Sequence, residues 1–117
     1  MAEFVKGDIV VIPFPFSDLS NTKRRPAIIL SNLLGNDYIM AQITSQNVFD
    51  AMSVIIDAND VEKGTLNITS NIRPNKLFTA DKNIVLYKIC SLKKDKLDVI
   101  INKVVDIFRN NTNIKAL

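Results

Sequence analysis

The 117-residue sequence contains no histidine and a single cysteine, and these two shortages restrict its chemistry most. Without histidine, the chain has no Ser-His-Asp triad, no Cys-His pair and no pair of histidines for cleaving RNA. Cys90 alone forms no internal disulfide, and one thiol without imidazoles does not supply the ligands of a zinc site. Acidic residues are scattered without the paired spacing that holds two magnesium ions, so we expect no metal and no other cofactor. Any catalysis would use arginine, lysine, threonine, serine, tyrosine or a carboxylate.

Glycine and long apolar runs are also scarce. The three glycines, Gly7, Gly35 and Gly64, are isolated, so no glycine-rich phosphate loop is present. The longest apolar stretches are about six residues, which is far too short to span a bilayer. The first residues lack the hydrophobic region of a signal peptide. We therefore expect a cytoplasmic protein without membrane contact.

The remaining composition is that of an ordinary folded protein, with 47% hydrophobic and 23% charged residues. A chain of this length has room for one compact domain, which we expect to span residues 1–117.

Charge is unevenly distributed along the chain. Residues 1–60 carry four basic and seven acidic side chains, whereas residues 61–117 carry eleven basic and five acidic ones. A basic half indicates an anionic partner, either a nucleic acid or an acidic peptide. A solvated lysine-rich surface explains the same distribution, and charge alone does not decide between them.

Short apolar segments rich in β-branched residues predict a small antiparallel β-barrel. The segments are residues 9–12, 26–31, 38–44, 53–57, 68–73 and 84–89. Residues 17–25 form a polar segment that favours irregular backbone and ends in three consecutive cations. A short helix or turn is predicted at residues 60–63.

The last segment has a helical period instead. Apolar residues between Leu97 and Phe108 recur at positions that form one stripe of a helix, and we expect this helix to pack against the barrel. Asp95 is the predicted N-cap. Five phenylalanines lie in apolar contexts suited to the core, namely Phe14, Phe16, Phe49, Phe78 and Phe108.

Four sequence elements, in order, resemble the MazF/PemK family of toxins. They are the opening GDIV with PF at residues 13–14, the segment KRRPAIILS at 23–31, AQITSQ at 41–46 and SNIRPNKL at 70–77. The resemblance runs from about residue 5 to residue 108. Each element is weak by itself, but four in order at suitable spacing are specific.

The resemblance implies a mainly β (α+β) fold, an SH3-like antiparallel barrel with a C-terminal α-helix, usually as a symmetric homodimer. It implies the toxin of a type II toxin–antitoxin pair. Such a toxin is a metal-independent, sequence-selective endoribonuclease that cleaves single-stranded RNA through attack by the 2′-hydroxyl, leaving a 2′,3′-cyclic phosphate and a 5′-hydroxyl. It also implies a cognate antitoxin whose extended acidic tail occupies the RNA groove.

The family's catalytic arginine falls on Arg25 and its catalytic threonine on Thr44. The chemistry agrees, because a guanidinium matches phosphate oxygens bidentately and a hydroxyl hydrogen-bonds a phosphate oxygen. In other contexts Arg25 is an ordinary loop cation and Thr44 caps a turn.

The expected RNA-binding residues are Lys23, Arg24, Ser45, Gln46, Arg73, Lys76 and Asp18. Lys23 and Arg24 supply electrostatic attraction in the groove. Lys76 is expected to contact a phosphate. Arg73 either contacts a phosphate or joins strands through a salt bridge. Ser45 and Gln46 contact bases or form a polar turn, and Asp18 contacts a base edge or caps its loop.

Two alternatives to the nuclease remain open. One is a toxin of the same barrel fold that binds a protein target, as gyrase-poisoning toxins do. The other is a catalytically inert RNA-binding barrel, which would usually present exposed aromatics to stacked bases. The chain also departs from many relatives, which have a glycine where it has Cys90 and Ser91, and its first loop lacks the Glu-Gly motif of some relatives. Cys90 is expected to be a small buried residue.

Overall fold

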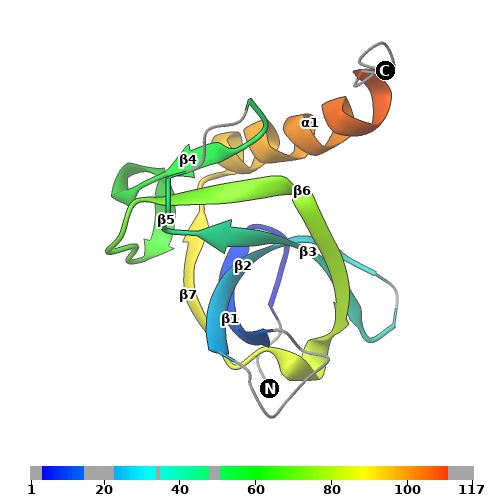
Figure 1. The fold of residues 1–117 in the computed structure, drawn as a ribbon. Coiled ribbons are helices and arrows are strands. Elements are labelled where there is room, and N and C mark those ends of the chain that lie inside the picture. Colours follow the sequence, from blue (N-terminus) through cyan, green and yellow to red (C-terminus); the bar gives the residue numbers. More distant parts are fainter. Residues whose placement is uncertain (1–3, 15–22, 34, 48–50, 111–117) are drawn as a thin grey trace.

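The computed structural model describes residues 4–14, 23–33, 35–47 and 51–110, which form seven strands, two short 3-10 helices and one α-helix (Figure 1). The strands are β1 (Asp8–Phe14), β2 (Lys23–Asn32), β3 (Asp37–Thr44), β4 (Val54–Ile56), β5 (Val61–Gly64), β6 (Ser70–Asp81) and β7 (Tyr87–Leu92). The 3-10 helices are Ala58–Asp60 and Lys82–Ile84, and the helix α1 is Lys94–Asn110.

All strand pairs in the sheet are antiparallel, in the order β4-β6-β3-β2-β1-β7-β5. The sheet curls strongly, so that β1, β2, β3 and β6 surround a common interior (Figure 1). The expected small antiparallel barrel with a C-terminal helix is confirmed, in the form of a curled half-barrel whose edge strands are β4 and β5.

Two apolar clusters cover the two faces of this sheet. Successive side chains of a strand point to opposite faces, so the continuous run at Ile9–Ile12 is shared between both. One cluster faces the helix and contains Ile9, Ile28, Ile43, Ile72 and Ile100, with further residues around them. The other lies inside the curl and consists of Val10, Ile12, Ala27, Ile29, Tyr38, Met40 and Ala80. Burial on both faces explains why polar and apolar residues do not alternate along these strands.

Helix α1 lies across β6 and closes the first cluster (Figure 1). Leu97 and Ile100 are buried there, and Ile101 and Val104 pack against the cluster, which confirms the first part of the predicted stripe. Val105 and Phe108, in its last part, are 41% and 74% exposed. The helix begins at Lys94, so the predicted N-cap was wrong: Asp95 lies in the first turn, where its carboxylate accepts a hydrogen bond from the Lys96 N–H. Within the described residues, no helix is long and apolar enough to cross a membrane.

Two strands are longer than predicted. β2 begins at Lys23, because Lys23 pairs with Phe14 of β1 and so the cationic segment becomes strand. β6 continues past Pro74 to Asp81 through an irregularity in which residues 74–76 have no partner on β3. A bulge of this kind tolerates proline, since no ladder hydrogen bond is required there.

Other boundaries also differ. The helix or turn predicted at residues 60–63 is helical only at Asp60, which ends a 3-10 helix capped by the Asp57 carboxylate. Residues 61–64 form strand β5 because they pair with β7. β7 spans Tyr87–Leu92 rather than residues 84–89, since Ile84 belongs to a 3-10 helix. The type and boundaries of these short elements depend more on the strands they pair with than on their own sequence.

A buried carboxylate joins the segment before β1 to the neighbouring strand β7. Asp8 is 1% exposed and accepts hydrogen bonds from the Val5 N–H at 2.9 Å and the Ser91 hydroxyl at 2.8 Å, with the Lys88 ammonium at 3.9 Å. A buried charge requires such partners. Ser91 therefore has a structural role here, as a hydrogen-bond donor to this carboxylate.

Gly64 should tolerate alanine less well than Gly35, although both have positive φ angles of +86° and +107°. A Cβ on Gly64 would lie 2.7 Å from the Ile89 carbonyl oxygen and 2.9 Å from Cys90 Cα. A Cβ on Gly35 would have no described neighbouring atom within 4 Å. We expect Gly35→Ala to cost about 1 kcal/mol through backbone strain alone, and Gly64→Ala about 3 kcal/mol. Urea unfolding of both variants measures the difference, and equal costs would contradict the tight β5–β7 contact.

Candidate functional site

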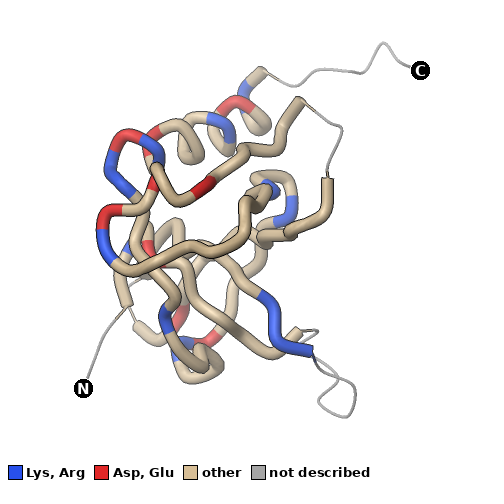
Figure 2. The backbone as a smooth tube through the Cα atoms, turned by 90° about the vertical axis from the view of Figure 1, so that its left-hand side faces the viewer, with Lys and Arg blue, Asp and Glu red and all other residues tan. Residues whose placement is uncertain are grey.

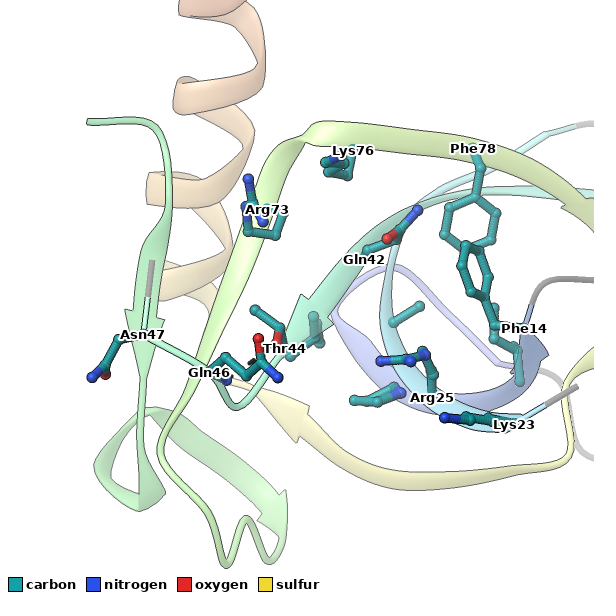
Figure 3. A pocket seen from close by; sticks show the side chains of 14 residues that line it. Phe14, Lys23, Arg25, Gln42, Thr44, Gln46, Asn47, Arg73, Lys76 and Phe78 are labelled. Carbon is teal, nitrogen blue, oxygen red and sulfur yellow. Dashed lines mark hydrogen bonds between the residues drawn. The ribbon is translucent and has the colours of Figure 1, made fainter. Parts of the chain in front are cut away.

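A cavity of about 610 Å³ opens at one end of the curled sheet (Figure 3). Its walls come from β1, β2, β3, β6 and the turn that follows β3. The lining residues are Ile12, Phe14, Lys23, Arg25, Pro26, Ala27, Gln42, Ile43, Thr44, Gln46, Asn47, Arg73, Lys76 and Phe78.

Strand register places the two predicted catalytic residues on one face. Ala27 of β2 and Gln42 of β3 form the last pair of this ladder. Arg25 and Thr44 each lie two residues beyond it, so strand alternation directs both side chains to the same face. Arg25 also pairs with Ile12, whose side chain belongs to the apolar cluster inside the curl. The site is therefore the polar end of a face whose remainder is buried and apolar.

The same alternation separates residues that are neighbours in the sequence. Lys23 and Arg25 line this cavity, whereas Arg24 and Ser45 line a second cavity of about 500 Å³ on the helix-facing side. Arg25, Thr44 and Gln46 border both cavities. Lys23 and Arg24 thus line different cavities, and Arg25 borders both of them.

The irregular part of β6 supplies the opposite wall. Arg73 pairs with Gln42, and residues 74–76 then bulge from the ladder before Leu77 pairs with Ala41. Pro74 is buried and fixes this bulge, and Lys76 lines the cavity from it. Figure 3 shows Arg73 and Lys76 across the cavity from Arg25 and Lys23.

Positive charge dominates the cavity. Lys23, Arg25, Arg73 and Lys76 line it, and no described Asp or Glu does. Lys23, Arg25 and Lys76 form no ion pair with a described residue, in contrast to lysines such as Lys94, which pairs with Asp98. Figure 2 shows the start of β2 as an unbroken basic stretch, whereas basic and acidic residues are mixed near α1. Uncompensated charge in a concave site attracts an anion.

The turn after β3 is fixed by two hydrogen bonds. The Thr44 hydroxyl oxygen accepts from the Gln46 N–H at 3.1 Å, and the Asn71 side-chain amide donates to the Gln46 carbonyl at 3.0 Å. Asn71 pairs with Thr44 across the ladder and is 8% exposed. Because the Thr44 oxygen acts as an acceptor here, its hydroxyl proton is available to a ligand in the cavity.

The structure thus brings together most of the residues proposed from the sequence, namely Arg25, Thr44, Lys23, Gln46, Arg73 and Lys76. Arg24 and Ser45 face the second cavity, and Asp18 lies outside the described residues. Sequence reasoning missed Gln42, Asn47 and Asn71. Alternation back from Thr44 indicates Gln42, but nothing local indicates Asn71, whose partner is 25 residues away.

The phenylalanines also differ from expectation. Phe14 and Phe78 pack against the apolar cluster inside the curl, as expected, but they are only partly buried and also line the cavity. Phe108 is exposed, and Phe16 and Phe49 lie outside the described residues.

Cys90 is buried, as expected, and is remote from this chemistry. Burial raises the pKa of its thiol and the Asp8 carboxylate raises it further, while Lys88 acts in the opposite direction. A raised pKa disfavours the nucleophilic thiolate. Among the described residues, no three His, Cys, Asp or Glu side chains are placed to hold a metal ion.

Fold and cavity together define a small curled β-barrel protein with a cationic site suited to a polyanion. Residues 5–108 match the family described as PemK-like, MazF-like toxin of type II toxin-antitoxin system, and the chain belongs to this family. Comparison with curated protein sequences gives no match.

Solved structures of low sequence identity share the fold. An endoribonuclease in complex with its cognate antitoxin from a mycobacterial species has a TM-score of 0.74 at 11% identity, covering 94% of this chain and 99% of that one. MazF from Deinococcus radiodurans has a TM-score of 0.73 at 18% identity, and the match covers 92% of this chain and 98% of that one. The Mycobacterium tuberculosis toxin MazF-mt6 has a TM-score of 0.68 at 19% identity, and the match covers 86% of this chain and 95% of that one.

Asn71→Ala should destabilise the protein, because it leaves the Gln46 carbonyl without its donor and removes a buried amide. We expect a loss of about 1–3 kcal/mol in the free energy of unfolding. Asn32→Ala is the matched control: Asn32 is exposed, its bond to the Phe4 carbonyl is 3.5 Å long, and its cost should stay within about 0.5 kcal/mol. Equal losses in urea unfolding would show that Asn71 does not fix the turn.

Proposed function

We propose that this chain is the toxin of a type II pair and acts as a metal-independent endoribonuclease on single-stranded RNA. The observation that carries the proposal is that Arg25 and Thr44 line one cavity from the same face of the sheet, together with three further cations. Family membership supports it, as do the endoribonucleases among the proteins that share the fold.

RNA supplies its own nucleophile in this reaction. The 2′-oxygen loses its proton and bonds to the adjacent phosphorus, the bond from phosphorus to the 5′-oxygen breaks, and that oxygen takes up a proton. The products are a 2′,3′-cyclic phosphate and a 5′-hydroxyl. The protein has to align the 2′-oxygen with the leaving oxygen and stabilise the charge of the pentacoordinate phosphorane.

Arg25 is suited to the charge. Its planar guanidinium can donate two parallel hydrogen bonds to phosphate oxygens, and its charge is directed toward the cavity that it lines. Thr44 is suited to orientation. Its oxygen is held by the Gln46 N–H, so its hydroxyl donates toward the phosphate in a fixed direction.

The other cations guide the backbone of the substrate. Lys23 lies beside Arg25 on β2, and Arg73 and Lys76 occupy the opposite wall (Figure 3). This spacing fits an extended single strand with more than one phosphate in contact. Gln46, at the border of the two cavities, is placed to contact a base or a sugar.

The same surface suits an inhibitor. A cognate antitoxin with an extended acidic tail would use the cations that attract RNA, and so binding of one would exclude the other. Two of the proteins that share the fold are described as complexes with antitoxins. A symmetric homodimer, expected from the family, remains a prediction, and size-exclusion chromatography with light scattering tests it.

Cleavage of a long single-stranded RNA in EDTA is the direct test. We expect discrete cuts by the wild type, a loss of about 10²–10³-fold in the cleavage rate with Arg25→Ala, and a comparable or smaller loss with Thr44→Ala. Arg24→Ala is the matched control, because Arg24 is the adjacent cation on the opposite face; we expect its rate to fall only a few-fold.

Each outcome has a clear meaning, provided that all variants unfold cooperatively. Equal losses at Arg24 and Arg25 would point to general electrostatics rather than a catalytic arginine. RNA left intact by the wild type would overturn the nuclease proposal and favour a protein target.

Salt dependence tests the contacts with phosphate. Replacing Lys23 or Lys76 with alanine should weaken RNA binding and reduce the slope of log K against log salt by about 0.7 per lost contact. Lys63→Ala removes an exposed charge on β5, away from the cavity, and should leave the slope unchanged. The slope is measured for the three variants by binding titrations at several salt concentrations. The fluorescent oligonucleotide carries a 2′-O-methyl group at the cleaved nucleotide so that it is not cut.

A further inference from the structure

An aromatic pair forms one end of the cavity. Phe14 belongs to β1 and Phe78 to β6, and two other strands separate these in the sheet. The rings nevertheless meet, with centroids 6.3 Å apart and planes tilted by 57°, because the sheet curls. Both side chains are partly buried: they pack on the apolar cluster inside the curl and also line the cavity.

The side chain of Gln42 lies beside this pair. Its backbone pairs with Arg73 on one side and Ala27 on the other, so it stands in the middle of the sheet face between the aromatic pair and the Arg25–Thr44 site. Figure 3 shows its amide directed into the cavity. Within the described part of the chain this amide makes no hydrogen bond, so its donors and its acceptor face the space that a ligand would fill.

We propose that Phe14, Phe78 and Gln42 form a subsite for one nucleobase next to the scissile phosphate, an inference that rests on the proposed function. A base needs a flat apolar surface for its face and a polar group for its edge, and these three residues provide both. Gln42 and Thr44 are two residues apart on β3, about 7 Å along the strand. Base and phosphate of neighbouring nucleotides span such a distance.

The surrounding charge favours a nucleotide over an apolar peptide side chain as the occupant. Lys23 and Arg25 lie next to Phe14, and Lys76 lies near Phe78 and Gln42 (Figure 3). A base stacked on the rings would carry its phosphates directly to these cations. The subsite would therefore contribute sequence selectivity at a single position of the RNA.

A thermodynamic cycle between protein and RNA isolates this contact. The cleavage site of the wild type is mapped first, and an oligonucleotide blocked by 2′-O-methyl at the cleaved nucleotide is then made with an abasic residue at each flanking position in turn. We expect one position at which base removal weakens binding to the wild type about tenfold. At that position the same removal should have almost no effect on Phe78→Leu or Phe14→Leu.

Leucine keeps the apolar cover of the core but removes the aromatic face, so the variants should still fold. Phe78→Tyr retains the ring and should restore the sensitivity to the base. Phe108→Leu is the matched control, because Phe108 is exposed on α1 and does not line the cavity. Gln42→Glu, which replaces an amide donor with an acceptor, should change the preferred base at this one position and leave the other positions of the cleavage motif unchanged.

Several results would overturn the proposal. Base removal that affects the wild type and Phe78→Leu equally at every position would show that the rings only cover the core. If Phe78→Leu weakens binding of an acidic peptide but leaves the effect of base removal unchanged, the rings contact a peptide and not a base, and the proposal also fails. These outcomes leave RNA cleavage intact, whereas failure of the wild type to cleave or bind any RNA would refute the proposed function itself.

Discussion

Burial of strands β2 and β3 on both faces, in one fixed antiparallel register, is the constraint on which the rest of the structure depends. A shift by one residue would exchange every side chain between the helix-facing cluster and the cluster inside the curl. The register that satisfies both cores also directs Arg25 and Thr44 to one face, two residues beyond the last pair of β2 and β3. The geometry of the site is therefore stabilised by burial of the adjoining apolar residues of the same strands.

The curl of the sheet has a second consequence. It brings β1 and β6 together across the interior, so that Phe14 and Phe78 form a boundary between the apolar cluster and the cationic cavity. Charges beside such a boundary are less screened than on an open surface, yet they stay hydrated enough to avoid the cost of burial. The bulge at residues 74–76 completes the arrangement by placing Lys76 over the same space.

Sequence patterns were most informative where one physical rule dominates. The periodic spacing of apolar residues predicted the central strands and α1. The resemblance to MazF/PemK toxins implied Arg25 and Thr44 as catalytic residues, and the absence of histidine is consistent with this choice. Predictions failed where pairing decided the outcome. Lys23 joins β2 because of β1, residues 61–64 become a strand because of β7, and β6 passes through Pro74 because a bulge needs no donor there.

The sequence by itself determined the fold class, the family resemblance and the residue types available for chemistry, since these follow from composition, period and ordered motifs. Only the tertiary structure decided which of those residues share a site. Lys23, Arg24 and Arg25 are consecutive cations, but strand alternation sends Arg24 to the opposite face. Gln42 and Asn71 gained their places through contacts between strands distant in the chain, and local sequence does not encode such contacts.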